Sequence, residues 1–153
     1  MNQPRLDFES LSFKIGISGT YWGKKPQYEI LINDTVVAQK EISQESKKVE
    51  YTQFKFDIEE DKEFILSIRL TNKEDSDTVL DETNTVILKD MLLNIESIEI
   101  EDIELEFLKW TLSSFVPDDP KRPKLECCVN LGWNGSYKIV IGSPFYLWLL
   151  ENM

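Results

Sequence analysis

The segment Val86–Leu105, VILKDMLLNIESIEIEDIEL, constrains the fold more than any other part of the chain. Its isoleucines and leucines stand mostly two residues apart with acids between them, which is typical of β-strands that have one buried and one solvated face. The alternation changes phase near Glu96-Ser97 and again near Glu101-Asp102, which predicts a β-bulge or a strand that crosses from one sheet to another. A helix is the weaker interpretation, because it would spread the isoleucines around its whole circumference.

Shorter stretches with the same alternation, separated by turn signals, occur elsewhere in the chain. They cover residues 11–17, 28–32, 54–58 and 64–70. Asn33-Asp34 predicts a tight turn, and Asn134-Gly135 predicts a hairpin between the short stretches that flank it. Many short strands with long acidic or proline-rich connections favour an all-β fold, and we predict an antiparallel β-sandwich of jelly-roll type that is similar to a carbohydrate-binding module.

We expect a single domain over residues 1–153, because this length is typical of one hydrophobic core. Residues 1–10 are predicted to be a lead-in arm, and residues 143–153 an apolar C-terminal segment. The predicted core consists of Phe13, Ile15, Ile30, Ile32, Phe54, Phe56, Leu66, Ile68, Leu93, Ile95, Ile98 and Ile100.

The charge of the chain narrows the classes of partner. With 28 acids against 17 bases, the net charge is −11, which repels phosphate and argues against nucleic-acid binding. This charge favours cations, basic protein surfaces and neutral ligands such as glycans. The first ten residues contain no apolar stretch of signal-peptide length, and no apolar run approaches a membrane span of about 20 residues. We therefore expect synthesis in a cytoplasm and no membrane insertion.

Catalysis is not expected. The chain lacks histidine, which removes the usual general base near neutral pH and the commonest zinc ligand. Asp118-Asp119 is an acid pair, but neighbouring residues on one proline-rich loop seldom face each other across a substrate. Cys127 and Cys128 are predicted to be reduced thiols, since a disulfide between adjacent cysteines is strained.

An acidic loop is the candidate cation site. Asp75, Asp77 and Asp81 lie in it, with Asn72 and Asp90 at its ends, and calcium prefers several oxygen ligands of these kinds. No EF-hand pattern is present. The alternative is a solvated acidic loop without an ion.

Two aromatic residues in a glycine-bordered loop are the candidate glycan site. Tyr21 and Trp22 could provide the flat face on which a sugar ring stacks. The alternative is that Trp22 caps the core. Trp110, Trp133 and Trp148 are predicted to be core or interface residues.

The C-terminal apolar run is the candidate protein contact. Phe145, Tyr146, Trp148 and Leu149 belong to six consecutive apolar residues, which suit a docking strip for a neighbouring subunit. The alternatives are a strand buried on both faces and a short terminal helix packed on the sandwich.

Residues 19–105 resemble the calcium-dependent xylan-binding modules, which are small jelly-roll sandwiches. Trp22 and Pro26 precede the strand 28–32, Asn33-Asp34 stands at its turn, Asn72 closes the strand 64–70, and Asp90 opens an apolar strand. Lys73 and Met91-Leu92 depart from the acid and the Arg-Asn pair of that family. The resemblance implies a sandwich fold and a glycan site, with calcium as the implied cofactor; Lys73 removes one oxygen ligand and adds a positive charge.

Nearly the whole chain is also similar to uncharacterised structural proteins of tailed phages of cyanobacteria. The segments GTYW, KKPQYEILIN, DMLLNIESIEIEDIEL, LGWNGSYKI and SPFYLWLLEN carry this similarity. It implies a virion component of the tail, neck or capsid surface that contacts other virion proteins and its own copies. The function predicted first is this non-enzymatic structural role in the virion. The alternative is a carbohydrate-binding module that recognises polysaccharide on the host surface.

Overall fold

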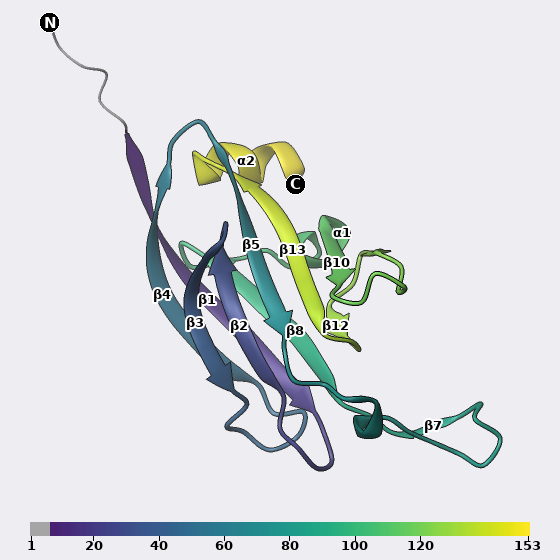
Figure 1. Cartoon of the computed structure of the whole chain (residues 1–153). Helices are drawn as coiled ribbons and strands as arrows, with labels where there is room; N and C mark the ends of the chain where they lie inside the picture. Colours follow the sequence, from purple (N-terminus) through teal and green to yellow (C-terminus); the bar gives the residue numbers. More distant parts are fainter. Residues whose placement is uncertain (1–6) are drawn as a thin grey trace, which may run out of the picture.

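The computed structural model describes residues 7–153, which form two β-sheets packed face to face (Figure 1). Sheet A contains, in spatial order, β12 (Asn130–Leu131), β8 (Leu92–Ile100), β1 (Phe8–Thr20) and β4 (Glu50–Glu59), and β9 (Ile103–Glu104) pairs with β8. Sheet B contains β11 (Leu125–Glu126), β10 (Ser113–Pro117), β13 (Gly135–Gly142), β5 (Glu63–Leu70), β2 (Gln27–Ile32) and β3 (Thr35–Glu41). The remaining elements are η1 (Asp75–Asp77), β6 (Val79–Leu80), β7 (Ile87–Lys89), α1 (Leu108–Thr111) and α2 (Phe145–Asn152).

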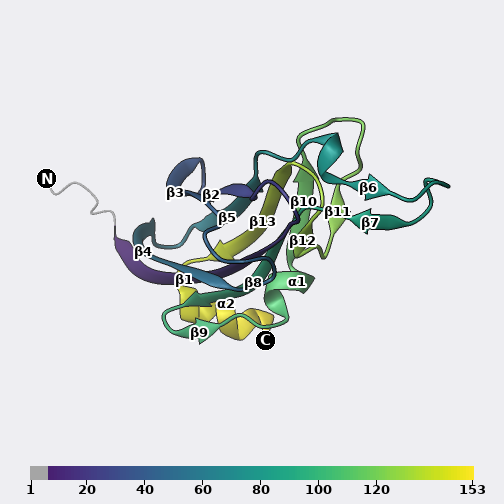
Figure 2. The same ribbon diagram turned by 90° about the horizontal axis from the view of Figure 1, so that it is seen from below.

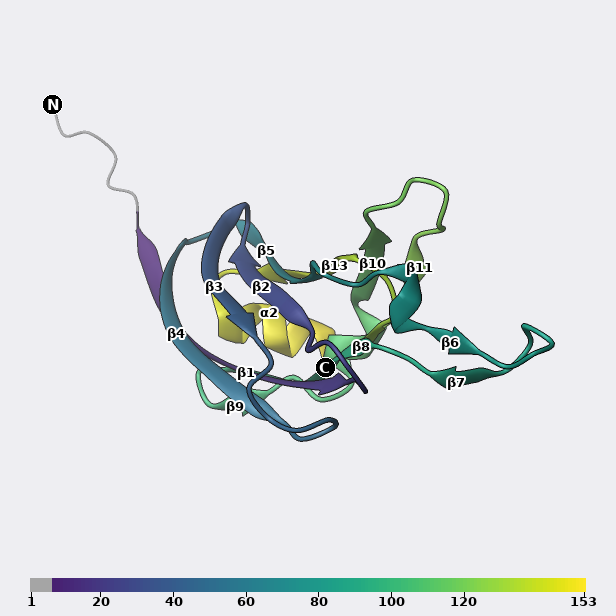
Figure 3. The same ribbon diagram turned by 60° about the horizontal axis from the view of Figure 1, so that its bottom comes forward.

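The two layers are clear in Figure 3, where β1 and β4 lie in one layer and β2, β5 and β13 in the other. Every strand pairing in residues 7–153 is antiparallel, and the chain passes repeatedly from one sheet to the other. The predicted fold class, an antiparallel β-sandwich of jelly-roll type, is therefore confirmed. The predicted turn at Asn33-Asp34 is present as well, since it joins β2 directly to β3.

One hydrophobic core lies between the sheets. In β1, every second side chain from residue 11 to residue 17 enters it, as the alternation predicts. The ring of Phe13 stacks on that of Phe54 with 4.9 Å between centroids and meets Phe64 edge-on at 6.1 Å. The predicted core residues are all buried except Phe54 and Phe56, which are half-buried and pack against the margin of the core.

The first change of phase in the alternation of the segment Val86–Leu105 is a β-bulge. Gly16 of β1 lies opposite Ser97 of β8, whereas the next residue, Ile17, lies opposite Ile95. Glu96 is therefore an extra residue in β8, and it shifts the alternation by one position. This predicted irregularity is confirmed.

The second phase change is a tight turn. Glu101 and Asp102 have φ angles of 54° and 63°, and they join β8 to β9 where Ile100 lies opposite Ile103. Positive φ at both central residues is typical of the two-residue turns that suit the twist of a hairpin. A bulge or a crossing between sheets is the wrong interpretation here, because β9 stays beside β8 in sheet A.

The predicted hairpin at Asn134-Gly135 is wrong. β12, which precedes it, pairs with β8 in sheet A, whereas β13, which follows it, pairs with β5 and β10 in sheet B. Residues 132–134 therefore connect the two sheets at the end of the sandwich. Gly135 is required by a close approach of the chain, because a Cβ atom there would lie 2.5 Å from the carbonyl oxygen of Val116.

Replacing Gly135 by alanine is expected to lower the free energy of unfolding by about 1–3 kcal/mol, because the added methyl group would force backbone apart. Gly23 is the matched control, since a Cβ atom there would meet no atom within 4 Å. Its alanine variant should change stability by less than about 0.5 kcal/mol. Urea unfolding of both variants measures the difference, and equal stabilities would contradict the close approach at Gly135.

The acidic loop of the sequence is partly ordered into secondary structure. η1 is followed by the small β6–β7 hairpin, which extends beyond the end of both sheets (Figure 2). Its apolar residues Leu80, Val86, Ile87 and Leu88 are exposed. The start of the segment Val86–Leu105 thus lies outside the core, and only the part from Met91 onward is buried at alternate positions.

The two ends of the described chain differ from the predicted boundaries. Residues 8–10 are already part of β1, where they pair with residues 57–59 of β4, so the predicted lead-in arm over residues 1–10 is too long. The rest of that arm, residues 1–6, lies outside the described residues. None of the helices in residues 7–153 combines the length and the apolar character that a membrane span requires.

Candidate functional site

The predicted glycan residues do not form an open platform. The Tyr21 side chain is half-buried, and its hydroxyl group donates a hydrogen bond of 2.8 Å to the carbonyl oxygen of Gln44. Trp22 is 49% exposed, its indole N–H donates to the carbonyl oxygen of Asp77 at 2.9 Å, and the ammonium group of Lys89 lies 4.9 Å from its ring centroid. Trp22 thus fastens its loop to η1 and does not cap the core.

The five predicted cation ligands are not brought together. No group of three or more acidic or cysteine side chains in residues 7–153 is arranged to hold a metal ion. Asn72 binds backbone groups of Gln27 and Lys25, and Asp81 accepts hydrogen bonds within its own turn in the β6–β7 hairpin. These two residues therefore stabilise local structure.

Asp77 is also engaged by protein donors. Its carboxylate accepts the backbone N–H of Glu74 at 2.8 Å and the ammonium group of Lys24 at 3.1 Å. Burial opposes ionisation of Asp77, but these two interactions outweigh it, and the pKa of Asp77 is lowered from its ordinary value. Asp75 is exposed and lies two residues before Asp77, at the start of η1.

Asp90 is paired with a lysine. The ammonium group of Lys73, whose side chain is 9% exposed, lies 2.7 Å from Oδ1 of Asp90 and 2.5 Å from the carbonyl oxygen of Gly132. The same Asp90 oxygen accepts hydrogen bonds from Thr78 and from the backbone N–H of Met91. Burial opposes the charge on Asp90, but these hydrogen bonds outweigh it and lower its pKa. Lys73 therefore supplies the cation at this position.

Lys73 also connects three segments that are far apart in the sequence. Its backbone N–H donates to Oδ1 of Asn134 at 2.8 Å, and its carbonyl oxygen accepts from Nδ2 of the same residue at 2.9 Å. Together with the side-chain contacts to Asp90 and Gly132, these bonds hold the strand end of β5, the start of β8 and the β12–β13 connection together.

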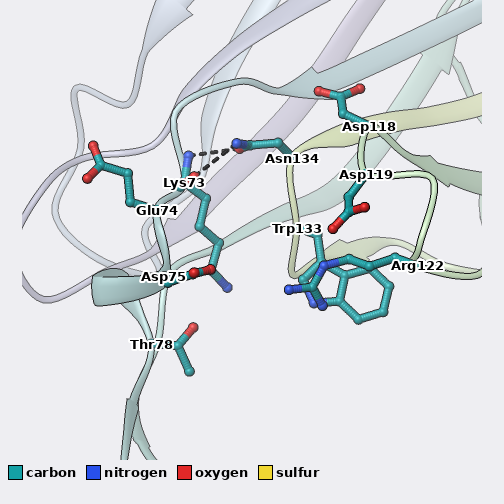
Figure 4. A pocket seen from close by; sticks show the side chains of 9 residues that line it. All are labelled: Lys73, Glu74, Asp75, Thr78, Asp118, Asp119, Arg122, Trp133 and Asn134. Atoms are coloured by element: carbon teal, nitrogen blue, oxygen red, sulfur yellow. Dashed lines mark hydrogen bonds between the residues drawn. The ribbon is translucent and has the colours of Figure 1, made fainter.

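A polar pocket of about 440 Å³ lies at this junction (Figure 4). It is lined by Lys73, Glu74, Asp75, Thr78, Asp118, Asp119, Arg122, Trp133 and Asn134. The η1 region forms one side of the pocket, and the proline-rich loop 118–124 with Trp133 forms the other. Among the predicted site residues only Asp75 lines the pocket.

The aromatic wall of the pocket is Trp133. One side of its indole approaches Phe115 of the core, with 6.3 Å between ring centroids. The guanidinium group of Arg122 lies over the ring, 4.4 Å from its centroid, as Figure 4 shows. Among the residues that the structure describes, Arg122 makes no ion pair, although two acids lie in the same loop.

The two neighbouring acids of the proline-rich loop point in different directions. Asp118 binds the guanidinium group of Arg69, with both carboxylate oxygens within 3.2 Å of Nη2. Asp119 accepts the backbone N–H of Lys121 at 2.9 Å and extends toward Arg122 in Figure 4. The pair therefore does not form two facing carboxylates.

The predicted C-terminal contact residues belong to α2, which packs against the end of β13. Phe145 is fully buried, and Trp148 and Leu149 are half-buried against the core. Tyr146 is 51% exposed, and Leu147 and Leu150 are exposed on the same short helix. The segment is therefore a short terminal helix packed on the sandwich, with apolar side chains on its exposed side as well, and the strand interpretation is wrong.

Comparisons with known proteins found one distant likeness. No family model matches the chain, and no curated protein matches it. A solved structure described as vCBM60 in complex with galactobiose superposes with a TM-score of 0.48 at 10% identity, covering 84% of this chain and 96% of that chain.

Proposed function

We propose that the protein is a non-catalytic carbohydrate-binding module and that it binds a neutral glycan in the pocket at Trp133. The observation that carries this proposal is the position of an indole ring in the wall of a polar pocket of about 440 Å³. Sugar rings combine apolar C–H faces with many hydroxyl groups, so their sites need a flat aromatic surface beside fixed hydrogen-bonding groups.

The other groups of the pocket suit sugar hydroxyls. The exposed carboxylates of Asp75 and Asp119, on opposite sides of the pocket, are strong acceptors, and the hydroxyl group of Thr78 lies on the side of Asp75. Lys73 and Asn134 fix the floor through their mutual hydrogen bonds. A rigid floor supports binding, because little conformational freedom is lost when a ligand enters.

The charge of the lining favours a neutral ligand. Four acids and two bases line the pocket, and the ammonium group of Lys73 is already paired with Asp90. Uronic acids, sialic acids and phosphates would be repelled by the remaining carboxylates.

Arg122 must move before a sugar ring can stack on Trp133. Its guanidinium group covers the indole, and its loop, residues 118–124, is exposed and contains two prolines. Removal of this side chain should uncover the ring. Because a cation–π contact at an exposed site contributes about 0.5–1 kcal/mol, Arg122→Ala should tighten glycan binding about two- to fivefold.

Titration with xylotetraose and galactobiose, followed by isothermal calorimetry, tests the proposal. We expect wild-type protein to bind at least one of these neutral oligosaccharides and not digalacturonic acid, the anionic counterpart. Trp133→Ala should weaken binding roughly tenfold or more, as loss of an aromatic stacking surface does. Thermal melting must show that this variant is folded, since Trp133 also contacts Phe115.

Trp22→Ala is the matched control, because Trp22 is half-exposed and lies outside the pocket. It should bind as the wild type does. Loss of binding in Trp22→Ala with retention in Trp133→Ala would place the glycan at the loop of Tyr21 and Trp22 and contradict the proposed pocket.

Absence of catalysis is part of the proposal. It is supported by the different directions in which the carboxylates of Asp118 and Asp119 point, because glycoside hydrolysis uses two carboxyl groups that flank the scissile bond. Release of reducing sugar from the oligosaccharides above would contradict it.

Protein contact in a phage virion is the second candidate, and the exposed side chains of α2 favour contact with a partner. Tyr146, Leu147 and Leu150 form an apolar strip on this helix. The virion, the neighbouring proteins and self-association remain predictions from the sequence. Assembly of particles that contain a Leu147→Ser/Leu150→Ser variant at wild-type level would contradict docking through this strip.

A further inference from the structure

An apolar hollow of about 560 Å³ lies beside α1, apart from the glycan pocket. It is lined by Glu104, Glu106, Phe107, Lys109, Trp110 and Val129. The side chain of Phe107 is 79% exposed and that of Trp110 is 47% exposed. Two exposed aromatic rings that share one concave surface are typical of an interaction site.

The carboxylates of Glu104 and Glu106 lie at the rim of the hollow. The ammonium group of Lys109 donates to Oε1 of Glu104 at 3.1 Å and to the carbonyl oxygen of Glu106 at 2.9 Å. The other carboxylate oxygen of Glu104, Oε2, is buried and accepts no hydrogen bond from residues 7–153. Oε2 has almost no accessible surface, so a ligand in the hollow does not reach it. The carboxylate of Glu106 is exposed and forms no ion pair within residues 7–153, so it is the acidic group that a positively charged ligand can reach.

We propose that this hollow binds an arginine side chain on the surface of a partner protein. The guanidinium plane and the aliphatic stem of arginine both pack well on aromatic rings, here those of Phe107 and Trp110. The guanidinium group then donates to the exposed carboxylate of Glu106, and the partly exposed carboxylate of Glu104 adds a second negative charge.

The charge of the whole chain supports a basic partner. With a net charge of −11, the protein attracts basic surfaces and repels other copies of itself as well as acidic segments. The apolar wall alone would accept any apolar side chain, whereas the unpaired carboxylate of Glu106 selects a donor of positive charge. This surface is separate from the glycan pocket, so either proposal can fail without the other.

A blocked nine-residue peptide, Ac-SGSLRLSGS-NH2, is a suitable probe, and its counterpart carries citrulline in place of arginine. Citrulline has nearly the same shape and no charge. The readout is the indole N–H signal of Trp110 in ¹H–¹⁵N correlation spectra of the full chain, assigned with Trp110→Phe. We expect the arginine peptide to shift this signal in a saturable way and the citrulline peptide to bind at least tenfold more weakly.

Two variants and one control complete the test. Glu106→Gln should lose the preference for arginine over citrulline, and Phe107→Ser should weaken binding of both peptides without unfolding, because Phe107 is largely exposed. Glu82→Gln, which removes an exposed acid of the β6–β7 hairpin, should bind as the wild type does.

Three results would overturn the proposal. Equal binding of the two peptides would leave an apolar hollow without selectivity for arginine. Absence of a Trp110 shift at millimolar peptide would exclude the site. Self-association of the wild type that Phe107→Ser abolishes would assign the hollow to a second copy of this chain.

Discussion

Replacement of Phe145 by alanine is expected to lower the free energy of unfolding by about 3–5 kcal/mol. Phe145 is the first residue of α2 and is fully buried in the core, so the truncation leaves a cavity. Its ring centroid lies 6.0 Å from that of Trp148, so packing of the rest of the helix depends on it. Its backbone N–H also donates to the carboxylate of Glu9 in β1 at 2.9 Å, which joins α2 to sheet A.

The neighbouring residue provides the control for Phe145. Tyr146→Ala removes a half-exposed ring from the same helix and should change stability by less than about 0.5 kcal/mol. Urea unfolding followed by circular dichroism measures both variants. Equal and small effects would mean that α2 does not belong to the folded core, and the whole C-terminal segment would then be free to dock elsewhere.

Lys73→Met is expected to lower the free energy of unfolding by about 3 kcal/mol, because loss of one partner from a buried ion pair leaves an uncompensated charge. The uncompensated group is the carboxylate of Asp90, which would keep only the hydrogen bonds from Thr78 and Met91. Lys62→Met is the control, since the ion pair of Lys62 with Glu59 is exposed and should contribute less than about 0.5 kcal/mol.

The effect of Lys73→Met should depend on pH. Because the pKa of Asp90 is lowered in the folded protein, the Lys73–Asp90 pair contributes stability above the ordinary value of 3.8 and loses it as the pH falls through the depressed folded value. The difference in stability between wild type and Lys73→Met should therefore be full at pH 6 and should shrink below pH 3.8. A difference that is constant from pH 6 to pH 3 would contradict the ion pair.

The fold could be predicted because its signals are local. Alternation in β1, β5 and β8 reports directly on which side chains face the core, and one extra residue, Glu96, is visible in the sequence as a change of phase. Asn33-Asp34 is likewise a short-range turn signal that the structure uses.

The Asn134-Gly135 signal was misleading because it reports on turn geometry and not on the pairing of the flanking strands. Here the chain changes direction at that point but enters the other sheet. The glycine is needed because β10 approaches it closely. Local propensity alone cannot distinguish a hairpin from such a connection between sheets.

The candidate site could not be predicted because its parts are far apart in the sequence. Lys73, Asp119 and Trp133 come together only through the pairing of β5, β10 and β13 in sheet B. The acidic loop suggested a cation site, but its carboxylates are engaged separately, and Lys73 stands at the junction. The one signal of this arrangement in the sequence was Lys73, which stands where the xylan-binding modules that residues 19–105 resemble have an acid.

Calorimetric titration of metal-stripped wild-type protein with xylotetraose and galactobiose, in EDTA and again in excess calcium, tests the pocket most directly. Because the ammonium group of Lys73 already occupies the position between Asp90 and Gly132, we predict saturable binding of at least one oligosaccharide with the same affinity in both solutions. Binding that occurs only in calcium, or no binding of either oligosaccharide, would contradict a metal-independent glycan site at Trp133.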